Sequence, residues 1–495
     1  MSGRALRATR LAVRLGALLW TTGGCAGSPG TTAPRPGEVE LPSRWRYEIR
    51  PSVELDFLEA TICFDGAAPR ELRAGKDEAA ARLRYARWTS PGPVRRLPVE
   101  RGRIQLGRAP AHACVTYGVD LSEGGSLGAA VRRLPDGLLA SPNVWLWRPE
   151  RRAADSRATL QLVLEGDMRA SLPWAREVTS ETYQLSPNAF AFDSQAAFGA
   201  FRSVHGEHAG VPFEAALMDV ATAPDEETVG AWMRSAIELA SLGPGGFPAV
   251  RLHALVLPAG SETEPVAFGS VTRGGAGSVL LFVSENATLA GLNSDWVLPH
   301  ELSHLFLPFV AREHAWFSEG LATYYQEVLR ARGGVLSEQQ ALLNIARSTQ
   351  SAAQEGTGRT LREESRAMHQ TYAFRSVYWA GAAFFLMADV ALREASQGQR
   401  SLDAVLAELR RGEGSEAEMS SLDDLLSRLD RLAGTPVFRR LADECLNRTF
   451  PDVAPVLEAL GARAEGGWTV VEDARLVSVR QAIFGKPPTT PGFRP

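Results

Sequence analysis

The sequence predicts an α+β protein of several domains: a β-sandwich-like domain, a domain built on a mixed sheet and a mainly helical domain. Three observations predict this fold class. Short segments of alternating polar and apolar residues fill 44–168, strand and helix patterns mix over 169–335, and apolar residues three and four apart dominate 336–485. The length of 495 residues also suits three or so domains.

Composition and charge narrow the class of protein. Hydrophobic residues make up 45% of the chain and charged residues 22%, as in an ordinary soluble globular protein. The net charge of -4 is too small to steer the chain toward nucleic acid or an anionic membrane. No Lys/Arg cluster lies beside aromatic residues. We therefore expect no nucleic-acid partner.

The amino terminus has the order of a secretory signal. Arg4, Arg7 and Arg10 precede an apolar run at 11–20 that Arg14 interrupts, and small residues follow it. The run is too short to span a bilayer.

The small residues before Cys25 resemble a bacterial lipoprotein cleavage site, although Thr22 stands where leucine is usual. We expect 1–25 to be a signal peptide of this type, with simple secretion as the alternative. Residues 26–43, rich in Gly, Pro, Ser and Thr, would form a flexible tether. The protein would then be exported from a bacterial cell and held at a membrane through lipidated Cys25.

In the first domain, 44–168, strand-like segments are separated by Gly/Pro-rich turns. Trp145 and Trp147 could form a carbohydrate-binding platform, but core packing is the commoner role of such aromatic residues. Cys63 and Cys114 lie in strand-like segments, and they either form a disulfide or stay as two buried thiols. The predicted strands are 53–57, 103–106, 113–117 and 158–164.

The second domain, 169–335, mixes both patterns. We expect His253 to be a satisfied core or edge residue of a strand rather than a ligand. His205 and His208 are expected in a loop, with an active-site loop as the alternative. The predicted strands are 190–192, 213–217, 251–257 and 277–283, and an amphipathic helix is predicted at 226–242.

The third domain, 336–485, is predicted to be mainly helical, with Ser401 and Ser421 as N-caps and Cys445 in the core. The end of the chain should contain a β-hairpin of 468–471 and 475–479, followed by a loose tail at 486–495.

The pattern H-E-x-x-H at His300, Glu301 and His304 points to metal chemistry. On a helix, two histidines four residues apart lie on the same face, which suits one zinc ion held by two nitrogens at about 2.0–2.1 Å. Glu301 can face a metal-bound water without being a ligand. A chance match on a helix with two ordinary histidines is the competing interpretation.

A third ligand distinguishes these interpretations, because a catalytic zinc needs three protein ligands and one open position. A metzincin requires Gly and His where this chain has Leu307 and Val310, so that pattern is excluded. Glu319 lies in the first turn of a helix-like segment, 318–325, after a connection long enough to bring it back to the first helix. His314 lies in that charged connection and is expected to be a loop residue.

These residues resemble the gluzincin zinc metallopeptidases, and most closely the glycyl aminopeptidase family, a relative of the large zinc aminopeptidases. A second block, with Tyr378, Gly381 and the Ser-Leu-Asp at 401–403, resembles the helix after the active site in that family. The specific likeness covers 296–328 and 372–408.

The resemblance implies a thermolysin-like catalytic domain with one Zn²⁺ per chain, held by His300, His304 and Glu319. Glu301 would act as the general base. Tyr378 matches the family's transition-state tyrosine and would donate to the oxyanion. Its rivals for this role are Tyr372 and Tyr325.

The substrate would be a peptide or protein. Aminopeptidases of this clan carry a Gly-rich edge strand with a glutamate that binds the free amino group. The matching segment here, 267–277, is Gly-rich without an acidic residue, and the nearest is Glu264. The sequence is therefore compatible with both an aminopeptidase and an endopeptidase. A non-catalytic, surface-anchored binding protein on a degenerate peptidase fold is the alternative, although such a protein has no use for Glu301.

Overall fold

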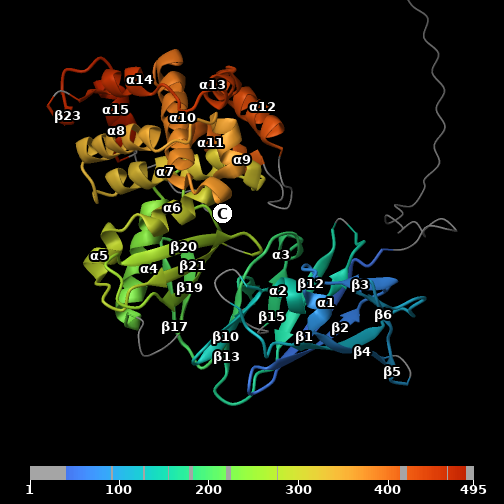
Figure 1. Cartoon of the computed structure of the whole chain (residues 1–495). Coiled ribbons are helices and arrows are strands. Elements are labelled where there is room, and N and C mark those ends of the chain that lie inside the picture. Colours follow the sequence, from blue (N-terminus) through green and yellow to red (C-terminus); the bar gives the residue numbers. More distant parts are fainter. Residues whose placement is uncertain are drawn as a thin grey trace, which may run out of the picture. The chain divides into compact units, whose positions relative to one another are not determined.

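Figure 1 shows the computed structural model of the chain, which describes residues 41–90, 93–125, 129–153, 155–177, 182–218, 224–275, 277–412, 421–464 and 466–486. The predicted signal peptide with Cys25, the tether up to residue 40 and the tail from residue 487 lie outside the described residues. None of the helices in the described ranges is long and apolar enough to cross a membrane.

The first described part, which we call the N-terminal β region (41–199), contains three sheets around a shared hydrophobic core. Along β2 (Phe57–Phe64) every second residue is buried, so one face of this strand lies in the core. The strand predicted at 53–57 was wrong, because a backbone hydrogen bond from Ser52 to Phe57 closes a turn there. Trp145 and Trp147 are fully buried in this core. They are therefore packing residues and do not form an exposed carbohydrate-binding platform.

The largest sheet of this region has the order β14-β15-β12-β1-β2-β8-β4-β5, and the two smaller ones have the orders β13-β16-β10-β9 and β11-β3-β7-β6. The further strands are β1 (Arg44–Pro51), β3 (Glu71–Arg73), β4 (Leu83–Ser90), β5 (Arg95–Arg96), β6 (Val99–Glu100), β7 (Arg103–Gln105), β8 (Cys114–Asp120), β9 (Val131–Leu134), β10 (Gly137–Ala140), β11 (Arg148–Pro149), β12 (Arg157–Leu162), β13 (Arg169–Ser171), β14 (Ala175–Arg176), β15 (Thr182–Leu185) and β16 (Ala196–Gly199). Short helices are α1 (Ala79–Arg82), α2 (Pro142–Trp145) and α3 (Asn188–Ala191).

Two of the cysteines in the described ranges are joined. Cys63 of β2 and Cys114 of β8 are register partners and form a disulfide, with their Cα atoms 4.1 Å apart. The disulfide alternative is therefore the one observed. Cys445 is free and buried, as expected.

A five-stranded mixed sheet follows, with the order β17-β18-β19-β21-β20. Its three inner strands are parallel, and both edge strands, β17 and β20, pair antiparallel. Apolar side chains of α4 and α6 share a hydrophobic cluster with this sheet. The elements are β17 (Arg202–His208), β18 (Val211–Leu217), α4 (Glu226–Ala240), β19 (Leu252–Pro258), β20 (Val266–Thr272), β21 (Gly277–Val283), α5 (Leu289–Ser294) and α6 (Val297–Ser303).

The rest of the described chain is mainly helical, as predicted for 336–485, and its apolar residues form a hydrophobic cluster centred on α7 and α10. Ser401 and Ser421 accept hydrogen bonds from backbone N–H groups at the starts of α11 and α12, so both are N-caps. The helices are α7 (Ala315–Arg332), α8 (Glu338–Gln354), α9 (Leu361–Thr371), α10 (Phe374–Ala395), α11 (Leu402–Gly412), α12 (Leu422–Ala433), α13 (Val437–Leu446), α14 (Ala454–Leu460) and α15 (Val477–Phe484).

Helices α7 and α10 cross with their backbones in contact at Gly320 and Gly381. A Cβ atom added to Gly381 would lie 2.6 Å from the Cα of Gly320 and would also collide with the carbonyl oxygen of Trp316. No side chain fits between the two helices here. Trp316 and Phe384 pack edge to face beside the crossing, with ring centroids 5.1 Å apart.

The structure corrects two predictions in the middle of the chain. The apolar run at 190–192 is not a strand, since its first two residues end helix α3. Three residues are too few to distinguish helix from strand by periodicity. Strands β13 to β16 pair within the N-terminal β region, so the mixed sheet starts near residue 202 rather than 169. An alternating pattern identifies a strand but not the sheet that it joins.

Two further predictions were wrong. His205 and His208 lie on the edge strand β17 rather than in a loop. The expected terminal hairpin of 468–471 and 475–479 does not form. Instead β23 (Thr469–Val470) pairs with β22 (Ala462–Arg463), and the second predicted strand is replaced by the start of α15. Its short apolar run suits either structure.

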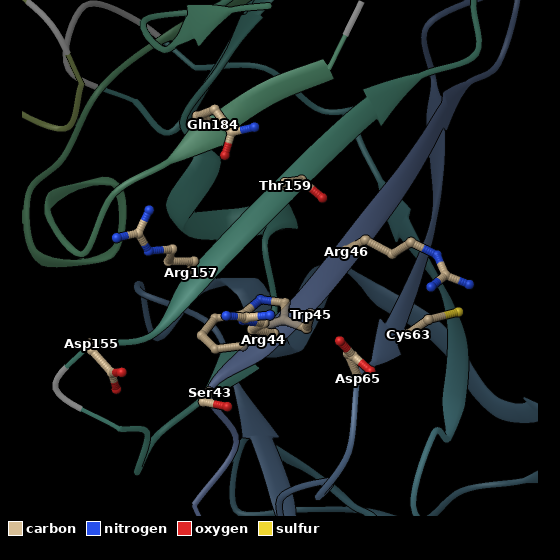
Figure 2. A pocket seen from close by; sticks show the side chains of 10 residues that line it. All are labelled: Ser43, Arg44, Trp45, Arg46, Cys63, Asp65, Asp155, Arg157, Thr159 and Gln184. Atoms are coloured by element: carbon tan, nitrogen blue, oxygen red, sulfur yellow. The ribbon is translucent and has the colours of Figure 1, made fainter. Parts of the chain in front are cut away.

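A cavity of about 650 Å³ lies on the largest sheet of the N-terminal β region (Figure 2). Its polar lining includes Arg44, Arg46, Arg157, Asp65 and Thr159. No lining residue comes from the mixed sheet or from α7 and α10. The candidate catalytic residues are therefore elsewhere.

His253 of β19 is fully buried and joins the mixed sheet to β13. Its Nε2 lies 2.9 Å from the hydroxyl oxygen of Ser171, and its Nδ1 lies 2.7 Å from that of Ser278. The Ser171 hydroxyl also donates to the carboxylate of Glu214. Burial lowers the pKa of His253 to about 4, although the Glu214 carboxylate acts in the opposite direction. His253 is thus a satisfied core residue, as predicted.

This lowered pKa predicts acid sensitivity. The unfolded chain takes up a proton on His253 near pH 6.5, whereas the folded chain does so only near pH 4. The stabilisation is therefore complete above pH 6.5 and is lost as the pH falls toward 4. Between pH 7 and 4 the wild type should lose about 3 kcal/mol more unfolding free energy than H253Q, because one pKa unit corresponds to about 1.36 kcal/mol. Urea unfolding at several pH values measures this difference, and equal losses in both proteins would contradict it.

The helix crossing predicts a steric effect of G381A. The added methyl group must separate α7 from α10, and overpacking of this kind typically costs about 1–3 kcal/mol. The midpoint of thermal unfolding should fall by several degrees. G412A is the control, because a Cβ at Gly412, the last residue of α11, meets no atom of the described ranges within 4 Å. Equal midpoints for the two variants would show that the crossing does not require glycine.

Candidate metal centre

Helix α6 and the 3₁₀ turn His304–Phe306 that follows it present two imidazoles on one face. The apolar residues Leu298 and Leu302 of α6 pack into the core of the mixed sheet, which directs His300 and His304 to the opposite side. Asp295 accepts a hydrogen bond from the backbone N–H of Val297 at 2.7 Å and so stabilises the start of the helix. The two imidazole centroids lie 5.0 Å apart.

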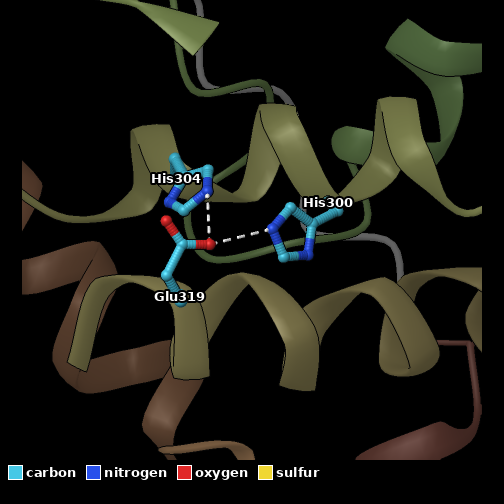
Figure 3. Close-up of side chains that lie close together, drawn as sticks. All are labelled: His300, His304 and Glu319. Carbon is cyan, nitrogen blue, oxygen red and sulfur yellow. Dashed lines mark hydrogen bonds and ion pairs between the residues drawn. The ribbon is translucent and has the colours of Figure 1, made fainter. Parts of the chain in front are cut away.

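Helix α7 brings Glu319 to these imidazoles from the other side (Figure 3). One carboxylate oxygen of Glu319 lies 3.3 Å from Nε2 of His300 and 3.5 Å from Nε2 of His304. One ligand atom from each of the three residues lies within 4.8 Å of the others. His314, in the short helical turn before α7, is not part of this group.

The spacing fits a single metal ion. Two ligands at about 2.0–2.1 Å in tetrahedral geometry are separated by about 3.3 Å, close to the nitrogen–oxygen distances found here. In both histidines Nε2 faces the shared centre, which leaves Nδ1 to bind a neighbour. The three side chains are also largely buried, so a bound ion would be shielded from bulk water.

The neighbours of the Nδ1 atoms orient both rings. Nδ1 of His300 lies 2.9 Å from Oε1 of Gln326, and Nδ1 of His304 lies 3.1 Å from the hydroxyl of Ser318. Such partners fix the ring and its tautomer, which is how proteins commonly tune histidine ligands. The sequence reasoning missed both residues. Their positions carry a signal: Ser318 precedes Glu319, and Gln326 follows it by two helical turns.

Opposite charges hold the group together. Burial alone would raise the pKa of Glu319, but the imidazoles of His304 and His300 outweigh it and keep this pKa far below its ordinary value. Burial alone would lower the pKa of His300, but the bond with Glu319 and the nearby Glu301 carboxylate raise it. A divalent cation would bind both imidazoles in their neutral form, so it would replace any proton on the Nε2 atoms that face the centre.

Glu301 lies next to the edge strand β20. Its Oε2 accepts a hydrogen bond from the backbone N–H of Val271 at 2.8 Å. A Cβ at Gly269 would lie 2.8 Å from Cγ of Glu301, so the glycine makes room for this side chain. The sequence reasoning linked this Gly-rich strand to substrate alone. The structure shows that it also holds Glu301.

Tyr378 faces the group from α10. Its ring stacks on His300, with centroids 6.1 Å apart and planes 16° from parallel. Burial, followed by the carboxylates of Glu319 and Glu301, raises the pKa of Tyr378 well above its ordinary value. Its hydroxyl therefore stays protonated and remains a hydrogen-bond donor at neutral pH.

Neither rival tyrosine has this placement. The hydroxyl of Tyr325 donates to Asp403 at 2.9 Å within the core. Tyr372 ends α9 in the left-handed conformation with its side chain 79% exposed. Thr323, one turn after Glu319, is buried, and its hydroxyl has no hydrogen-bond partner among the described residues.

A buried ionic network supports α7 from behind. Asp403 binds Arg332 through both carboxylate oxygens, at 3.1 and 2.7 Å, and also receives the Tyr325 hydroxyl. Asp389 of α10 binds Tyr324 and Arg393. Asp403 of the Ser-Leu-Asp block at 401–403, which formed part of the predicted family resemblance, thus has a structural role: it binds the helix that carries Glu319.

Comparison with a family model supports the predicted resemblance. Residues 306–383 match the model of the M61 glycyl aminopeptidases. This segment includes Glu319, Tyr378 and Gly381 and begins just after His304. None of the curated proteins compared with the chain matches it.

Solved structures of aminopeptidases and of a zinc metallopeptidase have a similar fold. An aminopeptidase N family protein from Idiomarina loihiensis has a TM-score of 0.64 at 17% identity, covering 84% of this chain and 78% of its own. An M1 zinc metallopeptidase from Deinococcus radiodurans, a mutant bound to the substrate Tyr-Ser-Ala, has a TM-score of 0.50 at 15% identity. This match covers 83% of the present chain and 95% of the Deinococcus protein. Aminopeptidase A of Legionella pneumophila, in complex with aspartic acid, has a TM-score of 0.53 at 12% identity. This match covers 82% of the present chain and 49% of the Legionella protein.

At these identities the structural matches show the fold, and the family model adds the segment that carries Glu319 and Tyr378. Together they agree with the resemblance predicted from the sequence: the chain is similar to the M61 glycyl aminopeptidases over 306–383, and its fold is similar to that of the aminopeptidase and zinc metallopeptidase structures.

Proposed function

We propose that the chain is a zinc-dependent metallopeptidase that hydrolyses peptide bonds. The observation that carries this proposal is the convergence of His300, His304 and Glu319 on one centre, with Glu301 and Tyr378 beside it. The peptidase family model and the zinc metallopeptidases of the same fold support it.

Zinc bound to these three ligands would supply a Lewis acid that activates water and polarises the substrate carbonyl. The chain provides the proton transfers. Glu301 takes the proton of the attacking water and passes it to the leaving amine. The N–H of Val271 fixes one oxygen of this carboxylate, so the other is free to act. Tyr378 donates its hydroxyl proton in a hydrogen bond to the oxyanion.

The edge strand β20 suits binding of an extended peptide, because its outer side has no partner strand among the described residues. An aminopeptidase is favoured by the family model and by the solved structures. An endopeptidase is the second candidate, because β20 itself carries no carboxylate that could hold a free amino group. The alternative of a non-catalytic binding protein is not favoured, since the whole His–Glu–His–Glu set is present.

The general base predicts the behaviour of E301Q. Wild type should bind about one zinc ion per chain and cleave members of a peptide library, and the cleavage positions distinguish exopeptidase from endopeptidase. E301Q should keep its zinc and lose about 10²–10⁴-fold in kcat, because proton transfer is removed. E313Q is the control, since Glu313 is an exposed carboxylate that pairs with His314. A wild type without zinc or activity, or an active E301Q, would exclude this mechanism.

The placement of Tyr378 predicts a loss of transition-state stabilisation in Y378F. Removal of one oxyanion donor should lower kcat about 10²–10³-fold and leave KM nearly unchanged. Y372F is matched chemically and affects an exposed tyrosine, so its kinetics should equal those of wild type. The assignment would be wrong if Y372F, and not Y378F, lost kcat.

A further inference from the structure

The segment 269–275 comprises the carboxyl-terminal part of β20 and the three residues after it. This segment contacts both the metal-binding helix and the N-terminal β region. Val271 donates to Glu301, as described above. Two residues later, Arg273 donates from Nη1 to the carbonyl oxygen of Leu307 at 2.8 Å and from Nη2 to the carbonyl oxygen of His304. One short segment therefore reaches the general base and the backbone of a metal ligand.

Arg273 binds at the place where the metal-binding helix ends. Helix α6 stops at Ser303, and the single 3₁₀ turn His304–Phe306 follows. The carbonyl groups at a helix end lack intrahelical partners and carry partial negative charge, so they are prone to fray. The planar guanidinium of Arg273 bonds the carbonyl oxygen of His304, where the turn starts, and that of Leu307, directly after the turn. It thereby fixes the turn that carries the imidazole of His304.

The same segment is held from the other side by Trp174. Trp174 belongs to the core of the N-terminal β region, is 1% exposed and packs against Trp145. Its Nε1 donates to the carbonyl oxygen of Gly274 at 2.8 Å, and its own carbonyl oxygen accepts from Arg251 of the mixed sheet. The hydrogen bond from Nε1 of Trp174 is buried, so its loss would leave the carbonyl oxygen of Gly274 without this donor.

The backbones also meet closely here. A Cβ at Gly275 would lie 2.7 Å from the carbonyl carbon of Pro173, the residue before Trp174. Only glycine permits this approach. The position of the segment is thus set by steric contact and by hydrogen bonding to the N-terminal β region.

We propose that Trp174 and Arg273 are positioning residues for catalysis, through which the N-terminal β region sets the placement of Glu301 and His304. This inference rests on the proposed peptidase function. It assigns the N-terminal β region a role in the reaction. Trp174 fixes the position of Gly274, and the backbone before Gly274 donates to Glu301 through the N–H of Val271. The Arg273 side chain, next to Gly274, holds the turn that carries His304.

Trp174 is tested by W174F, which keeps an aromatic ring and removes the N–H donor. We expect kcat to fall about 10–100-fold, as small displacements of catalytic groups can cause, with KM within about twofold of wild type. Hydrogen exchange of peptides covering 266–275 should become faster. W147F is the matched control, because Nε1 of the buried Trp147 has no hydrogen-bond partner in the part of the chain that the structure describes.

Arg273 is tested by zinc affinity, measured by competition with a chelator. R273Q should bind zinc about 10–100-fold more weakly, the usual cost of losing a group that orients a ligand. R273K should be intermediate, since lysine keeps the charge but lacks the planar fork. R46Q, at an exposed arginine of the N-terminal β region, should bind zinc like wild type.

The proposal is overturned if W174F keeps the kcat and exchange rates of wild type, if W147F loses as much, or if R273Q binds zinc normally. Should W174F fail to fold, G275A displaces the same segment and must show the same loss of kcat. If the wild type cleaves no peptide, the proposed function fails, whereas hydrogen exchange and zinc affinity still decide the positioning roles.

Discussion

The backbone contact between α7 and α10 is the constraint on which the reaction centre depends. Glu319 precedes Gly320, and Tyr378 lies one helical turn before Gly381, so this single crossing fixes the distance between the third ligand and the tyrosine. The crossing also explains the tyrosine-x-x-glycine spacing in physical terms. A larger residue at either glycine would move the two functional side chains apart.

The main free-energy cost of this arrangement is the burial of charged side chains, and ion pairing with side chains of opposite charge offsets this cost. On one side of α7, Glu319 lies between two imidazoles. On another side, Arg332 binds Asp403 in the core. A buried charge without a partner would cost several kcal/mol, so each ion on this helix requires its counterpart. The helix is thus fixed in rotation by partners on different faces, which keeps Glu319 directed at the histidines.

The sequence predicted most of what spacing alone determines. The i,i+4 histidines and the later glutamate could be found because helical periodicity converts spacing into a shared face. Tyr378 was found through the family resemblance, and the structure separates it from Tyr372 and Tyr325 by exposure and hydrogen bonding.

Contacts made across the fold could not be predicted. Val271 and Gly274 act through backbone atoms, which leave no mark in side-chain identity. Gln326 orients His300 across two helices, and its position two helical turns after Glu319 indicates a shared helix face but not the imidazole that it contacts. Short apolar runs such as 190–192 were misassigned because they satisfy the helix and strand patterns equally.

The disulfide between Cys63 and Cys114 has a consequence for how the first sheet assembles. The two cysteines are direct register partners of β2 and β8, on the face opposite to Leu58 and Ile62. A slip of one residue would turn those apolar side chains to solvent and carry the two sulfur atoms out of reach. Among the paired alignments of β2 and β8, the bond therefore fits the native register and makes that alignment covalent.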